Sequence, residues 1–429
     1  MAGATVSTIN DALKRLYLPR LRSTVNTATV LSSRLQRNTS STGVSGRDAI
    51  VPVNIRGSQA IGARGDDGTL PTPQNQTYIE TSIPYKYLYG TLRVTHPSIA
   101  ASKNDEGAWV KVVSSEMEGL MRDLKTDVNR QLFGDGTGVI GRVAGTITDQ
   151  YHAGNGILGD KFTAYGGHSF KIGQVLDVYT ARSGVDSKGL LEVIGVAGNV
   201  ITVSKKGGGD PGITGTSYLG TALAANDYLT REGSLGLEMM GLQGIIDAAT
   251  HAYTSTLQGV DRTKYPEFDA NVKVAGAALN DAAGALILDD FILEVEERGE
   301  SNITCGVTDR TVFRQIATTM TTDRRYTDTM ELKGGFKAIS WGDIPIFWDR
   351  DCPKDIEAYK ANNSSNLFFL DENELTRFEL EDWNFDDTDG NVLHRNENKA
   401  SYDATLYYYG NFGCMAPDNQ GVIRDIRAS

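Results

Sequence analysis

Three glycines at 136, 138 and 141 have the spacing of a dinucleotide-binding loop. That pattern binds pyrophosphate where it follows a strand and opens a helix, because the helix N-terminus then faces the phosphates. Here the glycines follow a segment with the apolar spacing of a long helix, so a phosphate would meet the carbonyl end of its dipole. The pattern therefore predicts a helix stop, and we expect no cofactor. A glycine-rich nucleotide-binding enzyme is the alternative from a different functional class.

Other residue types that could do chemistry are not combined into a known site. The five histidines show no i, i+4 pairing, and the three cysteines lie far apart without a CxxC motif. Asp387-x-Asp389-Gly390 resembles part of a calcium loop, but Phe385 occupies the first ligand position and Asn396 the twelfth, where a bidentate Glu is needed. Walker A, HExxH and GxSxG motifs are absent. We expect no catalytic residue, no metal site, and free thiols in a reducing compartment.

Composition is that of a soluble globular protein. The 429 residues are enough for about three domains, with 40% hydrophobic and 22% charged residues. No run of 18 apolar residues exists, so we expect no membrane span, and the first residues lack the order of a secretory signal. The net charge of −12 argues against a dedicated nucleic-acid binder.

The N-terminal segment has the opposite charge. Residues 1–40 hold six basic groups and one acid, a local net charge of +5. Two interpretations stay open. The segment packs on an acidic protein surface, or it contacts phosphates loosely in a salt-sensitive way. Residues 1–47 contain a helical patch at 9–18 and then turn rich in Ser, Thr and Asn, so we expect an arm that becomes ordered on another surface.

A long helix over residues 104–138 organises the rest of the chain. Its apolar residues recur at steps of three and four, which is typical of an amphipathic helix of about 29 residues and roughly 43 Å. Asn104 is the expected N-cap, and the glycines after Phe133 end the helix. The apolar face consists of Trp109, Val113, Met117, Leu120, Leu124, Val128 and Leu132.

The sequence pattern of residues 48–95 predicts a long hairpin. One arm is 49–55, the other 77–95, and the segment 57–76 between them is dense in Gly, Pro, Asn and Gln. A hairpin tip of this length is usually functional, and a lone ribbon is marginal in water, so we expect it to rest on a neighbour.

The remaining segments mix helices and strands. Residues 146–235 carry short strand patterns and a Gly198-Asn199 turn, which predicts a small inserted barrel or sandwich. In 236–355 we expect one helix ending before Gly299, a second capped by Thr308, and a hairpin over 338–348. Residues 356–410 predict long strands. The last, 400–409, has aromatic residues on both faces, so we expect both faces to be covered.

The order of these elements resembles a known family. A flexible arm, a projecting hairpin, a long helix ending in NRQLFGDGTG (129–138) and a late LKGGFKAISWGDIPIFWDRDCP (332–353) are similar to tailed-bacteriophage major capsid proteins. The resemblance covers nearly the whole chain. It implies an α+β fold of the Hong Kong 97 type, with a long spine helix, an extended β-hairpin loop and an inserted small β-barrel-like domain.

The resemblance also implies a division into domains. An N-terminal arm would be 1–47 and the extended hairpin, or E-loop, 48–95. The peripheral domain would comprise 96–145 and 356–410, the inserted β domain 146–235, and the axial domain 236–355 and 411–429.

What the resemblance implies in function is a shell subunit without enzymatic activity. Pentamers and hexamers would form an icosahedral virion capsid in the bacterial host cytoplasm and enclose double-stranded DNA, bound non-specifically. Portal, scaffolding and decoration proteins are the further partners of such shells. With about 47 residues before the hairpin, we expect any large scaffold to be a separate protein. The alternative within the same fold is an encapsulin-type nanocompartment shell.

Contact residues follow from this comparison. The inter-subunit candidates are Arg56, Arg64, Asp66, Asp67, Tyr78, Tyr85, Arg324 and Arg325. The lumen- or DNA-facing candidates are Lys14, Arg15, Arg20 and Arg22.

Overall fold

The computed structural model describes most of the chain. The described residues are 30–38, 47–58, 60–95, 106–152, 157–166, 170–184, 187–206, 223–250, 253, 255–299, 302–322, 329–331, 337–354, 364–387, 390–396 and 399–428. The predicted helix at 9–18, the cap Asn104, and the candidates Lys14, Arg15, Arg20, Arg22, Arg324 and Arg325 lie outside these residues.

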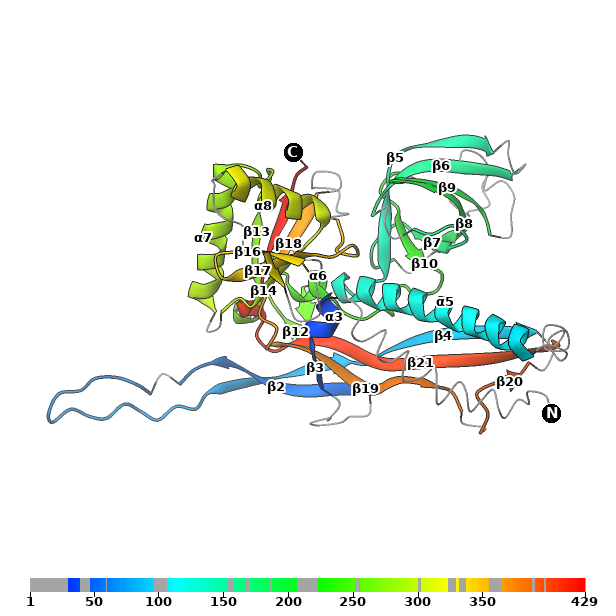
Figure 1. Ribbon diagram of the computed structural model, residues 1–429. Coiled ribbons are helices and arrows are strands. Elements are labelled where there is room, and N and C mark those ends of the chain that lie inside the picture. Colours follow the sequence, from blue (N-terminus) through cyan, green and yellow to red (C-terminus); the bar gives the residue numbers. More distant parts are fainter. Residues whose placement is uncertain are drawn as a thin grey trace.

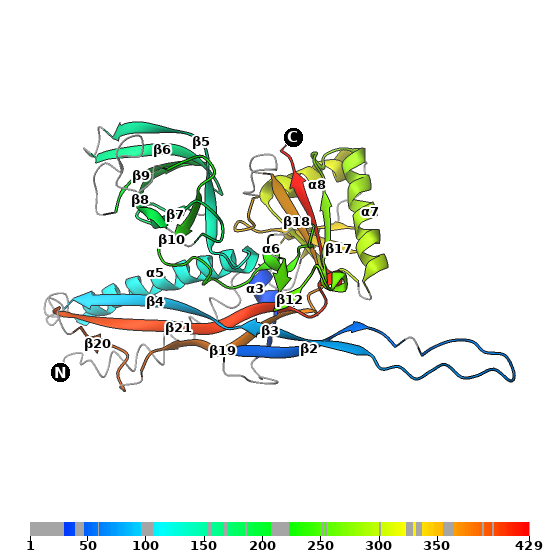
Figure 2. The same cartoon turned by 180° about the vertical axis from the view of Figure 1, so that it is seen from behind.

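A long sheet and one long helix form the elongated base of the molecule (Figure 1). The strand order is β1-β19-β21-β20, with β4 on the other edge of β21. The bounds are β1 (Gln36–Asn38), β4 (Lys86–Thr95), β19 (Leu375–Phe385), β20 (His394–Arg395) and β21 (Ser401–Cys414). Helix α5 (Glu106–Phe133) lies along this sheet, as Figures 1 and 2 both show. The short α3 (Val30–Arg34) contacts it.

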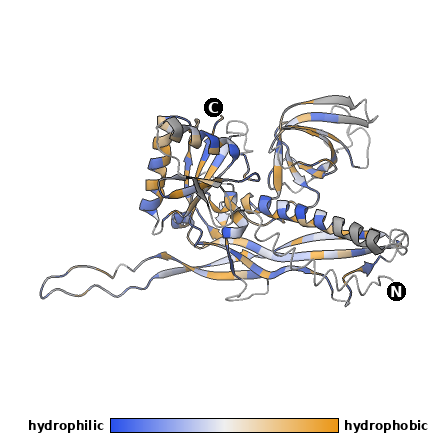
Figure 3. Cartoon of the chain, in the orientation of Figure 1, coloured by the Kyte–Doolittle hydropathy of each residue, from blue (hydrophilic) through white to orange (hydrophobic). Residues whose placement is uncertain are grey.

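Helix α5 packs through an apolar stripe. Met117, Leu124, Val128 and Leu132 are buried, whereas Arg122 and Asp123 are exposed, and blue and orange residues alternate along its described part (Figure 3). Gly90 of β4 permits the close approach, because a Cβ there would lie 3.3 Å from methyl groups of Leu120 and Leu124. The helix over 104–138 expected from the sequence runs from 106 to 133, and its 28 residues span about 42 Å.

A two-stranded ribbon projects from this base. It consists of β2 (Asp48–Arg56) and β3 (Thr77–Pro84), paired antiparallel. The prediction of one continuous arm over 77–95 is wrong, because the strand breaks at Tyr85 and β4 pairs with β21 instead of β2. Pro84 has no N–H to donate, its carbonyl accepts from Asn411 Nδ2 at 2.7 Å, and the Tyr85 N–H donates to the Arg47 carbonyl.

A seven-stranded mixed sheet forms a second layer. Its order is β13-β22-β18-β14-β17-β16-β15. Helices α7 (Ala282–Arg298) and α8 (Arg310–Thr322) pack against it through Leu288, Phe291, Val312 and Ile316. The strand bounds are β13 (Asn271–Val274), β14 (Cys305–Thr308), β15 (Thr329–Glu331), β16 (Lys337–Trp341), β17 (Ile344–Trp348), β18 (Ser365–Leu370) and β22 (Gly421–Ile426).

Two expectations for this region differ from the structure. Strand β18, grouped by sequence with the strands of 375–410, lies between β14 and β22 in the seven-stranded sheet. Its six residues are all buried, which suits a central strand. The α8 cap is Asp309, whose carboxylate accepts from the Val312 N–H at 3.0 Å. Thr308 instead ends β14 and donates to the Asn366 carbonyl.

Six strands close into a small barrel with its own core. The order around the barrel is β10-β5-β6-β9-β8-β7, and Val143, Phe162, Leu191 and Leu229 are among its buried residues. The bounds are β5 (Val139–His152), β6 (Ile157–Tyr165), β7 (Val175–Tyr179), β8 (Ser187–Ala197), β9 (Val200–Lys205) and β10 (Tyr228–Arg231). The barrel begins at 139, earlier than the 146 expected from composition, because β5 directly follows the glycines that end α5.

A compact junction connects these units. It holds α6 (Leu242–Ile245), β11 (Thr256–Leu257), β12 (Val260–Asp261), η4 (Pro266–Phe268) and η5 (Pro417–Asn419). Arg424 of β22 and Asp247 form a fully buried ion pair at 3.0 Å. The buried Arg262 donates to the Gly244 and Ile245 carbonyls. Removal of either Arg424 or Asp247 would leave a buried charge without its partner, which is strongly destabilising.

Candidate inter-subunit surfaces

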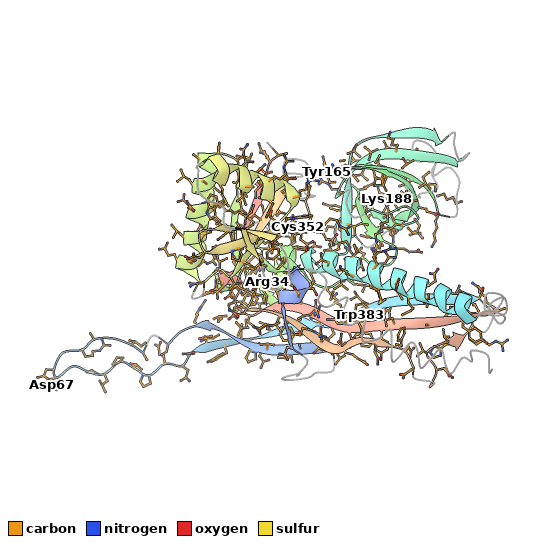
Figure 4. The ribbon with its side chains drawn as sticks, viewed as in Figure 1. Arg34, Asp67, Tyr165, Lys188, Cys352 and Trp383 are labelled. Atoms are coloured by element: carbon orange, nitrogen blue, oxygen red, sulfur yellow. The ribbon has the colours of Figure 1, made fainter. Side chains whose placement is uncertain are left out.

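The loop 57–76 of the ribbon, called the ribbon loop below, extends well beyond the body (Figures 1 and 2). All residues from 61 to 70 are exposed, including Ile61 at 89% and Leu70 at 81%. Asp67 lies at its far end (Figure 4). Apolar side chains this exposed lose free energy in water, so another surface that covered them would stabilise the loop.

Three candidate residues lie at the tip of the ribbon loop. The Arg64 guanidinium donates to the Thr69 carbonyl at 2.9 Å and to the Ala63 carbonyl at 2.9 Å. Asp66 and Asp67 are exposed in the turn that the Gly68 N–H closes on the Gly65 carbonyl. Arg64 therefore shapes the tip, and the two carboxylates point into solvent.

The other candidates on the ribbon divide into exposed and buried residues. Tyr78 is 62% exposed, and its hydroxyl donates to Gln76 Oε1 at 3.2 Å. Arg56 donates to Glu267 Oε1 at 2.8 Å, which joins the base of the ribbon to the body and lowers the pKa of Glu267. Tyr85, the remaining candidate on the ribbon, is buried within the subunit. Its ring is 6% exposed and packs with Ile83, and burial raises the pKa of its phenol.

A cluster of four tyrosines forms a surface that the sequence did not single out. Tyr89 lies opposite Tyr407 and Tyr87 opposite Tyr409 on the face of the β4–β21 pair that points away from α5. Ring centroids of Tyr87 and Tyr409 lie 5.0 Å apart edge to face, and those of Tyr407 and Tyr409 lie 5.0 Å apart and stacked. A hydrogen bond with Tyr89 raises the pKa of Tyr409 to about 12. We call these four residues the tyrosine ladder.

The ladder qualifies the expectation that both faces of the last strand are covered. On β21, Leu406 and Tyr408 are buried on the α5 side, whereas Tyr407 and Tyr409 are only partly buried on the other side, next to Tyr87 and Tyr89 of β4, which are 50% and 58% exposed. In the sequence, the available signal was the spacing of Tyr87 and Tyr89, which places both side chains on one face of a strand and Leu88 on the other. Which face is covered depends on where α5 packs, and that is a tertiary feature.

The described part of the N-terminal segment lies on the chain's own body. Strand β1 pairs parallel to β19, Arg34 forms an ion pair with Glu372, and Arg37 pairs with Glu379 and with Asp382 at 3.0 Å. These two arginines are therefore engaged by acidic protein groups, which is the first of the two interpretations of the basic segment. The residues proposed to contact phosphate lie outside the described ranges.

The glycine motif has a structural role here. Gly136 and Gly138 follow the end of α5 with φ of 80° and 81°, and a Cβ on Gly138 would lie 2.6 Å from the Ser234 carbonyl oxygen. Asp135 pairs with Arg182 at 2.6 Å and accepts from the Thr137 N–H. The motif thus turns the chain from the carbonyl end of α5 into the barrel.

Other reactive groups are held inert. Cys305, Cys352 and Cys414 are buried free thiols, and burial raises the pKa of each above its usual value. Over the described ranges, no group of three or more His, Cys, Asp and Glu side chains is arranged to hold a metal ion. Among the helices within those ranges, none is long and apolar enough to cross a membrane.

Comparison with known proteins finds likeness in shape alone. No family model and no curated protein matches the chain. The capsid asymmetric unit of cyanophage A-1(L) matches with 12% identity, 95% of this chain and 93% of the other, at a TM-score of 0.48. The holo-SrpI encapsulin complex of Synechococcus elongatus matches with 10% identity, 99% and 96% coverage, and a TM-score of 0.46. The capsid of Myoviridae phage XM1 matches with 8% identity, 92% and 91% coverage, and a TM-score of 0.43.

Of the three solved structures described above, two are phage capsids and one is an encapsulin. Because every TM-score is below 0.5, the functional proposal that follows rests on the geometry of this chain.

Proposed function

We propose that this chain is a major capsid protein that self-assembles into an icosahedral shell enclosing double-stranded DNA. The observation that carries the proposal is the ribbon loop, which leaves Ile61 and Leu70 more than four-fifths exposed and contributes little to the fold of its own body. A segment of this kind is explained if copies of the chain cover it. Closed rings of copies would bury one such loop per subunit.

The division of labour in the shell is part of the proposal. The seven-stranded unit, roughly 236–355 with 364–370 and 415–429, would supply the axial contacts of pentamers and hexamers. The α5 base would form the peripheral domain, and the ribbon with its loop would be the E-loop. The barrel, now bounded at 139–231, would be an insertion. Arg56, Arg64, Asp66, Asp67 and Tyr78 stay contact candidates, because all five are exposed. Arg324 and Arg325, outside the described residues, stay candidates too.

The charge of the chain supports a container for nucleic acid. A net charge of −12 limits adhesion of the wall to DNA during filling, so contact with the DNA would be non-specific and salt-dependent. Lys14, Arg15, Arg20 and Arg22 are the proposed lumen-facing residues. In this proposal the assembled protein is part of a virion made in the host cytoplasm. Portal, scaffolding and decoration proteins are its proposed partners.

The contents of the particle test the proposal. Particles isolated from cells that make the protein naturally are treated with nuclease, and their contents are then extracted and sequenced. The proposal expects closed shells that protect double-stranded DNA. Closed shells that contain one enriched cargo protein and no protected DNA would instead indicate an encapsulin-type nanocompartment. A protein that forms no particle under any condition would overturn both.

A further inference from the structure

A cavity of about 780 Å³ lies where two parallel strands of the seven-stranded sheet end. Strands β14 and β17 are parallel neighbours, with Thr308 opposite Trp348 at their carboxyl ends. Helix α8 follows β14 and the segment 349–354 follows β17, so both line the cavity, and Cys352 in its wall is labelled in Figure 4. Open α/β sheets bind ligands outside the carboxyl ends of parallel strands, and this volume suits a small organic ligand.

Cations outnumber carboxylates around this cavity. The cations are Arg310, Arg314, Arg350 and Lys354, and the carboxylates are Asp309 and Asp349. Arg310 and Arg314 are exposed one turn apart on α8, and within the described residues neither guanidinium has a partner. Like charges at this spacing destabilise a helix, so an anion bound between them would relieve the repulsion. The planar guanidinium fits the oxygens of a phosphate group through paired hydrogen bonds.

The two carboxylates of the cavity are already engaged by the protein. Asp309 is buried, accepts from Ser365 Oγ at 2.9 Å and lies 3.9 Å from Lys354. Asp349 is also buried and accepts from Asn129 Nδ2 at 2.9 Å, and burial raises its pKa, which disfavours its charged form. The mouth of the cavity therefore keeps a surplus of positive charge.

Trp348 gives the cavity an aromatic wall. It is 45% exposed, whereas Trp341 and Trp383 are 8% and 1% exposed. An exposed aromatic face stacks on nucleic-acid bases without regard to sequence. An acidic peptide would use the cations and leave the indole in water, and inorganic phosphate would fill only a small part of the volume. A nucleoside phosphate uses both the guanidinium groups and the ring.

We propose that this cavity binds a nucleoside phosphate. Phosphate oxygens accept hydrogen bonds from the guanidiniums of Arg310 and Arg314, and the base stacks on Trp348. The ligand is a free nucleotide or the phosphorylated end of a nucleic-acid strand, since the two share this chemistry. All of these residues belong to one subunit, so the site goes beyond the proposed shell function and does not depend on it. It is also separate from the glycine motif after α5.

Calorimetric titration of the full-length, unassembled protein with dATP tests the phosphate contacts. In about 150 mM salt, which screens exposed charges beyond roughly 8 Å, one saturable site per chain is expected. Arg310→Gln with Arg314→Gln should weaken binding about tenfold or more, because both guanidinium donors are lost. The matched control, Arg122→Gln with Arg395→Gln, removes two exposed charges elsewhere and should bind dATP like wild type.

Trp348→Leu separates base stacking from phosphate contact. It should weaken dATP binding about tenfold and leave the binding of inorganic triphosphate unchanged, because triphosphate has no base to stack. Tyr78→Leu removes an exposed ring on the ribbon and is the control, which should bind dATP like wild type. Far-UV circular dichroism and the melting temperature of each variant establish that it is folded.

A short single strand with a 5′-phosphate, titrated alongside, identifies the source of the ligand. Tighter binding of the strand than of dATP assigns the site to a strand end, and tighter binding of dATP assigns it to a free nucleotide; both support the proposal.

Four results would overturn the nucleotide site. They are no saturable dATP binding, an equal loss in the Arg122 and Arg395 control, no effect of Trp348→Leu, and displacement of dATP by a lower concentration of polyglutamate, which would indicate an acidic-peptide site. None of them bears on shell formation, which electron microscopy of the same protein measures separately.

Discussion

Gly138 is a residue where backbone conformation and packing both require glycine. Its φ is +81°, and a Cβ would lie 2.6 Å from the Ser234 carbonyl oxygen. Gly145 has a similar φ of +88° but nothing within 4 Å of its Cβ position. We expect Gly145→Ala to lower the free energy of unfolding by about 1 kcal/mol through the left-handed backbone alone. Gly138→Ala should cost about 2 kcal/mol more, because the carbonyl must also move.

The measurement is the melting temperature of the two unassembled variants. An equal loss in both would show that the Ser234 contact has no energetic weight. That result would remove the structural explanation for the glycine motif after α5.

The buried carboxyl of Asp349 should make the free energy of unfolding depend on pH. Burial raises its pKa above the usual 3.8, against hydrogen bonds from the Asp351 N–H and Asn129 Nδ2, both at 2.9 Å. The folded state therefore holds this proton more tightly than the unfolded state, so stability falls as pH rises through the folded pKa. Asp349→Asn keeps an acceptor oxygen and removes the charge. We expect it to be more stable than wild type at neutral pH and equally stable below the unfolded pKa.

Thermal melts of wild type and Asp349→Asn, measured from neutral pH down to below the unfolded pKa of the carboxyl, check this prediction. The control is Asp290→Asn on an exposed position of α7, which should track wild type at every pH. A difference between Asp349→Asn and wild type that persists unchanged at low pH would contradict the assignment of a buried, charge-penalised carboxyl.

At the scale of elements, α5 is the helix on which the base is built. Leu124 is 7% exposed and contacts the Gly90 position of β4, whereas Arg122, two residues earlier, is exposed. Leu124→Asp places a charge in this apolar contact, and we expect a loss of several kcal/mol and an insoluble or unfolded protein. Arg122→Asp introduces the same residue on the solvent side and should stay soluble with a melting temperature near wild type. Expression, solubility and circular dichroism of the pair decide between these results.

Local patterns in the sequence predicted where helices and strands lie better than they predicted which strands pair with each other. The 3.6-residue period and the glycines located α5, and Gly198-Asn199 located the β8–β9 turn, because these signals depend on neighbours in sequence. The break between β3 and β4 depends on the pairing of β4 with β21, about 300 residues away, and the central place of β18 depends on pairing with β14 and β22, each about 60 residues away. Pro84 was the local sign of the break, since proline interrupts a ladder. The tyrosine ladder needed the position of α5 before its open face could be recognised.

At the scale of the whole molecule, the ribbon loop should be needed for assembly and dispensable for folding. Replacing 57–76 with Asn-Gly joins Arg56 to Thr77, two residues already paired, through a turn that suits a hairpin. Since the loop makes few contacts with the body, we expect the melting temperature of the unassembled subunit to stay within about 2 °C of wild type. Closed particles should be lost. Sedimentation velocity and negative-stain electron microscopy measure both effects, and intact particles as heat-stable as wild type would show that the loop does not hold copies together.

The most direct test is a cryo-electron microscopy map of the concentrated wild-type protein. The account predicts closed shells built from rings of five and six copies, in which each ribbon loop lies on a neighbouring copy. A protein that stays monodisperse and monomeric under every assembly condition, with its ribbon loop folded against its own body, would contradict it.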